Sequence, residues 1–191
     1  MKFKNRYSNL LQAKKSETKP KRVAKSAEDK ALTRALNFIK YRPRSAMEVV
    51  KKLQQLKYNA NEINSVVEQL TKVKILDDTR FVKDWVRFRD RLSPRGEYLL
   101  HQELQEKGIT KNTIENILEY RQTKKWSEEI GLQYNSKDSV DKRLAQTIVK
   151  KFSEKYEIKT DKDKNRLASK LARRGFSPNI VYDLVLSIRL K

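Results

Sequence analysis

An internal repeat constrains the fold of this chain more than any other feature of its sequence. When Leu53, Leu104 and Leu171 are superposed, their neighbours agree four residues earlier and five, ten and thirteen residues later. The residues at these places are all apolar: Val49, Leu100 and Leu167, then Tyr58, Ile109 and Phe176, then Ile63, Ile114 and Val181, then Val66, Ile117 and Leu184. Apolar residues that recur at spacings of three and four indicate helices, so the repeat predicts a helical unit present three times.

Polar residues also stand at equivalent positions in the three copies of the repeat. Asn59, Thr110 and Ser177 share one offset, and each stands directly before an apolar helical run whose first amides it can cap. Gly108 and Gly175 stand two residues earlier, where a left-handed residue would end the preceding helix. Each copy therefore contains a helix, a stop, a cap and a second helix.

Lys57 occupies the glycine position in the first copy, and the register of the repeat depends on it. We predict that Lys57 takes the same left-handed backbone conformation, at some cost in free energy. The alternative is one continuous helix that runs from about Ala46 past Glu62.

A further amphipathic segment precedes the helix pair in every copy. Its apolar positions are Leu32, Ala35, Leu36 and Ile39, then Phe81, Trp85, Phe88 and Leu92, then Leu144, Ile148, Phe152 and Tyr156. The sequence therefore predicts an all-α protein of three tandem three-helix modules. The predicted parts are a flexible basic arm at 1–27, modules at 28–76, 77–122 and 138–191, and a helix extension with Trp126 and a linker at 123–137. Units of about 50 residues bury little apolar surface alone, so we expect them to pack in an elongated, curved array.

The charge of the chain indicates the kind of partner. It carries 45 Lys and Arg against 24 Asp and Glu, a formal net charge of +21, and such a field attracts polyanions such as nucleic acid. There is no cysteine and a single histidine, His101, so we expect no metal site and no cofactor. No run approaches the roughly 18 apolar residues of a membrane span, and no secretory signal is evident, so we expect a cytoplasmic protein without a membrane partner.

Three stretches of the sequence resemble the RecX family. They are LDDTRFVKDWVRFR at 76–89, GEYLLHQELQEKGI at 96–109 and LARRGFSPNIV at 171–181. The resemblance covers residues 28–191, and it departs from the family at Lys57, in the long segment before the third module and in the basic arm. It implies a non-enzymatic regulator of recombination, DNA repair and the SOS response. Such a protein would bind RecA filaments on single-stranded DNA, restrain ATP hydrolysis, strand exchange and co-protease activity, and favour filament disassembly.

Two cationic stripes are the candidate contacts with DNA or the filament. The residues are Arg80, Lys83, Arg87 and Arg91 in the second module, and Arg166, Lys170, Arg173 and the flanking Arg174 in the third. The aromatic residues between 81 and 92 have helical core spacing, and we predict that they pack inside the module. The contacts would include single-stranded DNA and, without sequence preference, duplex DNA; we expect the protein to be a monomer.

Catalysis is the weaker interpretation. Asp77 and Asp78 could hold a metal or act as an acid and base, but they directly precede a helical run, where carboxylates cap amides. His101 has no nucleophile or orienting acid at a recognisable spacing, and no glycine-rich phosphate loop is present. The main alternative to a recombinase regulator is a basic architectural protein that coats DNA without a recombinase partner.

Overall fold

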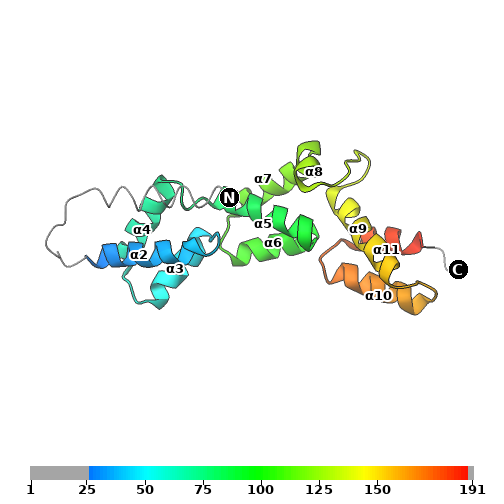
Figure 1. Ribbon diagram of the computed structural model, residues 1–191, viewed down its shortest axis with the longest axis horizontal. Helices are drawn as coiled ribbons and strands as arrows, with labels where there is room; N and C mark the ends of the chain where they lie inside the picture. The colour runs from blue at the N-terminus through cyan, green and yellow to red at the C-terminus, as the bar shows by residue number, and fades with distance from the viewer. Residues whose placement is uncertain (1–25, 189–191) are drawn as a thin grey trace. The chain divides into compact units, whose positions relative to one another are not determined.

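The computed structural model of the protein describes residues 26–188, and within that range it has ten α-helices and no strand (Figure 1). The predicted all-α class is confirmed. The chain divides into two compact units, with the boundary between Asp77 and Asp78. The predicted basic arm lies outside the described residues except for Ser26, which caps the first described helix, and Ala27, which begins it. The elongated, curved arrangement of the modules stays a prediction.

The first unit contains three capped helices around one core. They are α2 (Ala27–Lys40), α3 (Ala46–Gln55) and α4 (Ala60–Lys72). Ser45 and Asn59 begin α3 and α4 through reciprocal capping boxes, in which the amides and carboxylates of Glu48 and Glu62 take part. The buried core is formed by Ala31, Ala35, Ile39, Val49, Leu53, Ile63, Val66, Leu70 and Leu76. Ala35, Ile39, Val49, Leu53, Ile63 and Val66 belong to the predicted apolar stripes, whereas Ala31, Leu70 and Leu76 do not.

Lys57 ends the second helix of this unit with a left-handed backbone, at φ 62°. Gly108 and Gly175 have φ values of 75° and 78° at the equivalent places. Beyond the left-handed residue, the amide of Tyr58 donates to the carbonyl oxygen of Leu53 at 3.2 Å, a bond that closes the helix end. The prediction for Lys57 is therefore confirmed, and the continuous helix from Ala46 past Glu62 is excluded.

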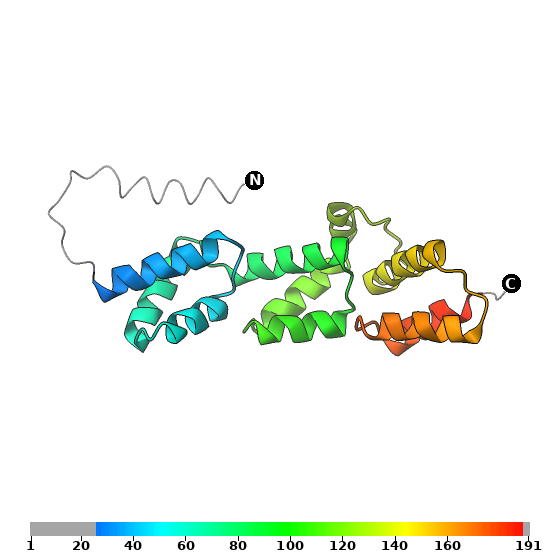
Figure 2. The ribbon, with the colours of Figure 1, turned by 60° about the horizontal axis from the view of Figure 1, so that its bottom comes forward.

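The second unit contains seven helices. They are α5 (Asp78–Leu92), α6 (Glu97–Glu106), α7 (Lys111–Arg121), α8 (Lys124–Ile130), α9 (Val140–Lys155), α10 (Asp161–Ala172) and α11 (Pro178–Leu186). One continuous core contains residues of both predicted modules, including Val86, Leu104 and Ile114 together with Leu144 and Leu171. α9 packs beside α10 and α11, as Figure 2 shows. The second and third modules therefore share their apolar interior.

The buried face of α5 differs from the predicted one. Phe81 is buried and Trp85 partly so, but Phe88 and Leu92 are 55% and 71% exposed, so the prediction that they pack in the core is wrong. Val82, Val86 and Asp90 are buried instead, at a spacing of four residues. The physical reason is that partners inside the unit bind the carboxylate of Asp90, which fixes the rotation of the helix.

Trp126 also lies in a different element from the one expected. The sequence predicts an extension of the preceding helix, but α7 ends at Arg121 and Thr123 begins a new helix, with its hydroxyl accepting from the amide of Trp126. The left-handed Gly131 ends this helix. The separate helix brings the fully buried indole of Trp126 into the core.

Candidate nucleic-acid interface

A buried guanidinium holds the second and third modules together. The side chain of Arg121 is 0% exposed and binds Asp90 in two-point geometry, with Nε to Oδ2 at 2.9 Å and Nη2 to Oδ1 at 2.7 Å. Its Nη1 donates to Oδ1 of Asp141, on α9, at 2.6 Å. The indole Nε1 of Trp126 donates to the same carboxylate of Asp90 at 2.9 Å. One side chain thus connects α7 to α5 and α9.

The buried charges of Arg121, Asp90 and Asp141 depend on one another. Burial disfavours the charged form of Arg121, but the hydrogen bonds and charges of Asp90 and Asp141 outweigh burial and raise its pKa above the ordinary value. Loss of one partner would leave an uncompensated charge in the interior. No local sequence pattern indicates this role, because Asp90 lies between Arg89 and Arg91 in a strongly charged helix.

Close backbone contact joins the loop before α6 to the turn after α10. The amide of Gly96 donates to the carbonyl oxygen of Arg174 at 2.8 Å. A Cβ at Gly96 would lie 2.0 Å from the carbonyl oxygen of Gly175, so no other residue fits without movement of the backbone. Across the same contact, Nη1 of Arg174 donates to the carbonyl oxygen of Pro94 at 3.2 Å. Arg174 is therefore positioned by the junction between the modules.

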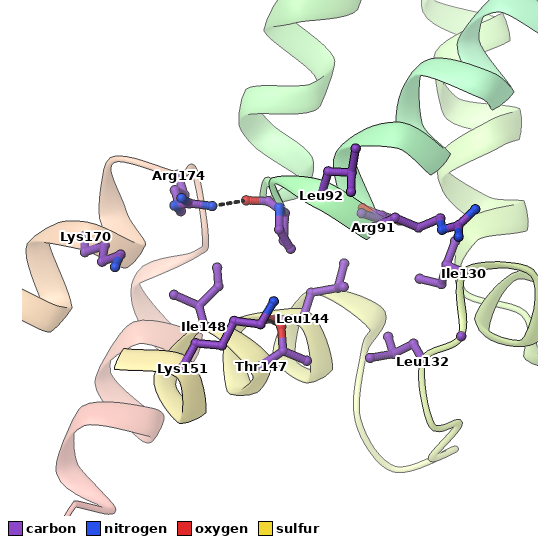
Figure 3. Close-up of a pocket in the computed structure, with 13 residues that line it drawn as sticks. Arg91, Leu92, Ile130, Leu132, Leu144, Thr147, Ile148, Lys151, Lys170 and Arg174 are labelled. Atoms are coloured by element: carbon purple, nitrogen blue, oxygen red, sulfur yellow. Dashed lines mark hydrogen bonds between the residues drawn. The ribbon is translucent and has the colours of Figure 1, made fainter. Parts of the chain in front are cut away.

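A cavity of about 300 Å³ lies at this junction. Four cations line it: Arg91 from α5, Lys151 from α9, Lys170 from α10 and Arg174 from the following turn (Figure 3). Its apolar wall consists of Leu92, Pro94, Ile130, Leu132, Leu144 and Ile148. We call Arg91, Lys151, Lys170 and Arg174 the cationic cluster.

The cationic cluster is not neutralised by acids. Arg91 and Lys151 are exposed and have no ion pair within residues 26–188, and the Nζ of Lys170 lies 5.1 Å from the ring centroid of Phe152. Burial, followed by the nearby charge of Arg95, lowers the pKa of the Arg174 guanidinium. The carboxylate of Asp90, which also lines the cavity, is already bound by Arg121 and Trp126. The cavity therefore presents an excess of positive charge to an anion.

Most of the predicted second-module stripe is paired within the protein. Arg87 donates to Glu129 at 2.5 Å and to Asp84 at 3.0 Å, while Lys83 lies 3.4 Å from Glu129. Arg80 lies 3.8 Å from Asp84. The hydrogen bond from Arg87 is the main reason that the pKa of Glu129 falls to about 2, against the opposing effect of burial. Lys83 and Arg87 link α5 to α8, and all three cations are less available to a partner than Arg91.

The third-module stripe is divided between the cavity and the open surface. Lys170 and Arg174 line the cavity, whereas Arg166 lies over the ring of Tyr156 at 4.7 Å and Arg173 is the exposed residue after α10. Of the eight predicted contact residues, the structure therefore brings Arg91, Lys170 and Arg174 together. It adds Lys151, which the sequence reasoning missed because α9 was interpreted only through its apolar face.

The structure offers no support for a metal centre. Among the described residues, no group of three or more His, Asp or Glu side chains is placed to hold a metal ion. α5 begins at Asp78, where a carboxylate complements the positive end of the helix. Between residues 26 and 188, no helix combines the length and apolar character needed to cross a bilayer.

Comparison with known proteins identifies the modules. Residues 31–70 match the model of the first three-helix domain of RecX, and residues 77–118 match the model of the second. The chain is similar to the regulatory protein RecX of Oceanobacillus iheyensis, at 34% identity over 61% of this chain and 45% of that protein. It is similar to the RecX of Prosthecochloris aestuarii at 35% identity over 47% of this chain and 59% of that protein. The matches thus span about half the length of these relatives.

A crystal structure of RecX from Lactobacillus salivarius has the same fold. The two structures superpose with a TM-score of 0.64 at 23% identity, over 83% of this chain and 94% of the other. The two domain models and the relatives named regulatory protein RecX support a RecX family protein, and the solved structure shows the same fold.

Proposed function

We propose that this protein regulates homologous recombination and DNA repair by binding RecA filaments on single-stranded DNA. It inhibits RecA ATPase, strand exchange and co-protease activity, and it acts in the cytoplasm as a monomer. The match of residues 31–70 and 77–118 to two RecX domains supports this proposal, as does the net charge of +21. No covalent chemistry is required, because binding alone would shift the filament toward disassembly.

The observation that carries the proposal is the convergence of the cationic cluster on one cavity. Its four cations come from α5, α9, α10 and the turn after α10, so a folded second unit is needed to assemble them. The buried Arg121 network and the contact between Gly96 and Gly175 hold these elements in place. A preassembled cationic surface suits a repeating polyanion or the acidic face of a filament.

Residues 28–76, 77–122 and 138–191 are, in this proposal, three modules that lie along the filament. Arg80, Lys83, Arg87, Arg166 and Arg173 would extend the contact beyond the cavity. The first three must exchange their internal acidic partners to do so, and we expect them to contribute less than the cationic cluster.

The experiment is a titration of this protein into RecA that hydrolyses ATP on single-stranded DNA. We expect inhibition at amounts far below those that could coat the DNA. An architectural protein that only coats DNA would inhibit in proportion to its coverage. An unchanged ATPase rate through full coverage would contradict the proposed function.

A further inference from the structure

Phe88 is held on the outside of α5 although it is apolar. It is 55% exposed, and Leu92, one turn further along, is 71% exposed. Val86 and Asp90 lie two residues before and after Phe88, and at about 100° per residue they occupy nearly the opposite side of the helix. Both are buried, and Arg121 and Trp126 bind the carboxylate of Asp90. Phe88 is therefore fixed outward by interactions on the inner face.

The two tryptophans near this surface, Trp85 and Trp126, are engaged in contacts within the protein or buried. The ring of Trp85 has Arg89 at 4.8 Å and Lys107 at 4.3 Å, and its Nε1 donates to Glu103 at 3.1 Å. Trp126 is fully buried. Among the exposed aromatic residues of the described chain, Phe88 alone lacks a hydroxyl group; the others are Tyr41, Tyr98, Tyr134 and Tyr182. Phe88 thus presents an open ring with no polar group to hydrate.

The surroundings of Phe88 are cationic on the side of the cavity. Arg91 and Leu92, three and four residues later, share its outward face and line the cavity. Lys151 and Lys170 line the same cavity from α9 and α10. An open aromatic ring beside cations that lack acidic partners is the arrangement by which proteins bind single-stranded nucleic acid, with bases stacked on the ring and phosphates on the cations.

We propose that Phe88 is a stacking platform for an unpaired base of a single strand whose phosphates lie on Arg91, Lys151 and Lys170. This inference rests on the proposed function for its ligand, single-stranded DNA. It adds a physical reason for preferring a single strand, since the bases of a duplex are already stacked on one another and cannot open onto Phe88 without loss of pairing. The cations alone would bind both forms.

The first test measures fluorescence anisotropy of a labelled oligothymidylate with the 191-residue chain and without RecA. We expect Phe88→Ala and Phe88→Leu each to weaken binding about fivefold or more, and Phe88→Tyr to retain it. Leucine keeps an apolar side chain without an aromatic face, so it separates stacking from simple apolar contact. The matched control is Tyr182→Ala, which removes an exposed aromatic residue from α11; we expect no loss.

The second test replaces the oligothymidylate with an abasic strand of the same length and with a duplex. The difference between the native protein and Phe88→Ala should fall to about nothing on both, because neither offers an unpaired base. Equal binding of oligothymidylate by the native protein and Phe88→Ala would overturn the inference. An undiminished difference on the abasic strand would overturn it as well.

Inhibition of RecA ATPase by the same variants separates this inference from the proposed function. If Phe88→Ala loses inhibition while binding oligothymidylate normally, Phe88 contacts the recombinase itself, and stacking is wrong while the proposed function stands. If the native protein never inhibits RecA but Phe88→Ala still loses strand binding, the proposed function fails and the stacking platform stands.

Discussion

At the scale of single residues, Lys57 adopts a backbone conformation that favours glycine. Its φ of 62° places Cβ in a disfavoured position, at a cost on the order of 1 kcal/mol. The side chain of Lys57 is exposed, so its removal costs little packing. The residue keeps the repeat in register because its left-handed turn is followed by the capping box of Asn59 and Glu62.

Lys57→Gly should therefore stabilise the first unit, by a few tenths to about 1 kcal/mol after allowance for the greater freedom of glycine in the unfolded chain. Urea unfolding followed by circular dichroism measures the change. Lys52→Gly is the matched control, since Lys52 lies within α3, where glycine should destabilise by about 1 kcal/mol. If both variants lost stability equally, the assigned strain at Lys57 would be wrong.

Asp90 is the second residue whose role can be tested by a single substitution. Asp90→Asn keeps the shape of the side chain but leaves the buried Arg121 without the carboxylate that binds it at two points, and we expect the free energy of unfolding to fall by on the order of 3 kcal/mol. Asp84→Asn, at a partly exposed acid of the same helix, should cost under about 1 kcal/mol. If Asp90→Asn lowered the free energy of unfolding no more than Asp84→Asn does, the central role of the Arg121 network would be refuted.

At the scale of elements, Glu129 couples α8 to α5 through Arg87 and Lys83. Its pKa falls from 4.5 to about 2, so this coupling stabilises the folded state fully above pH 4.5. The contribution declines as the pH falls toward 2, because the unfolded chain takes up the proton first. We expect Glu129→Gln to lower stability at pH 6 and to differ much less from the native protein near pH 2. A difference that stays constant with pH would contradict this assignment.

The positions of the helices other than α8 follow from the sequence because local signals determine them. Apolar spacing located the core stripes, and Gly108, Gly175 and the caps at Asn59 and Thr110 marked the ends. The rotation of α5 could not be predicted, since it depends on the long-range bonds of Asp90 to Arg121 and Trp126. The stripe of Phe88 and Leu92 looks like a core face until that burial is known.

The candidate site was only partly predictable for the same reason. Arg91, Lys170 and Arg174 appear on two separate stripes in the sequence, and only tertiary packing brings them together. Lys151 has no distinguishing sequence pattern, because 45 Lys and Arg residues are spread along this chain. The pairing of Arg87 with Glu129 joins residues 42 positions apart, and no local rule indicates it.

At the scale of the whole molecule, the positive charge should make DNA binding depend strongly on salt. Each phosphate contact on a single strand contributes a slope of about 0.7 to the logarithm of affinity against the logarithm of salt concentration. Replacement of Arg91, Lys151 and Lys170 by Ala should lower that slope by about 2, as measured by anisotropy over a salt series. An unchanged slope would show that these cations do not contact phosphate.

The most direct test of the account is RecA ATPase on single-stranded DNA, titrated with this triple Ala variant and with a control that loses the same charge. The control replaces Lys111, Lys124 and Lys125, exposed lysines of α7 and α8 outside the cavity. We expect the native protein and the control to inhibit alike at amounts too small to coat the DNA, and the triple variant to lose inhibition while its unfolding transition is preserved. Equal inhibition by all three proteins would contradict the claim that the cavity is the working surface.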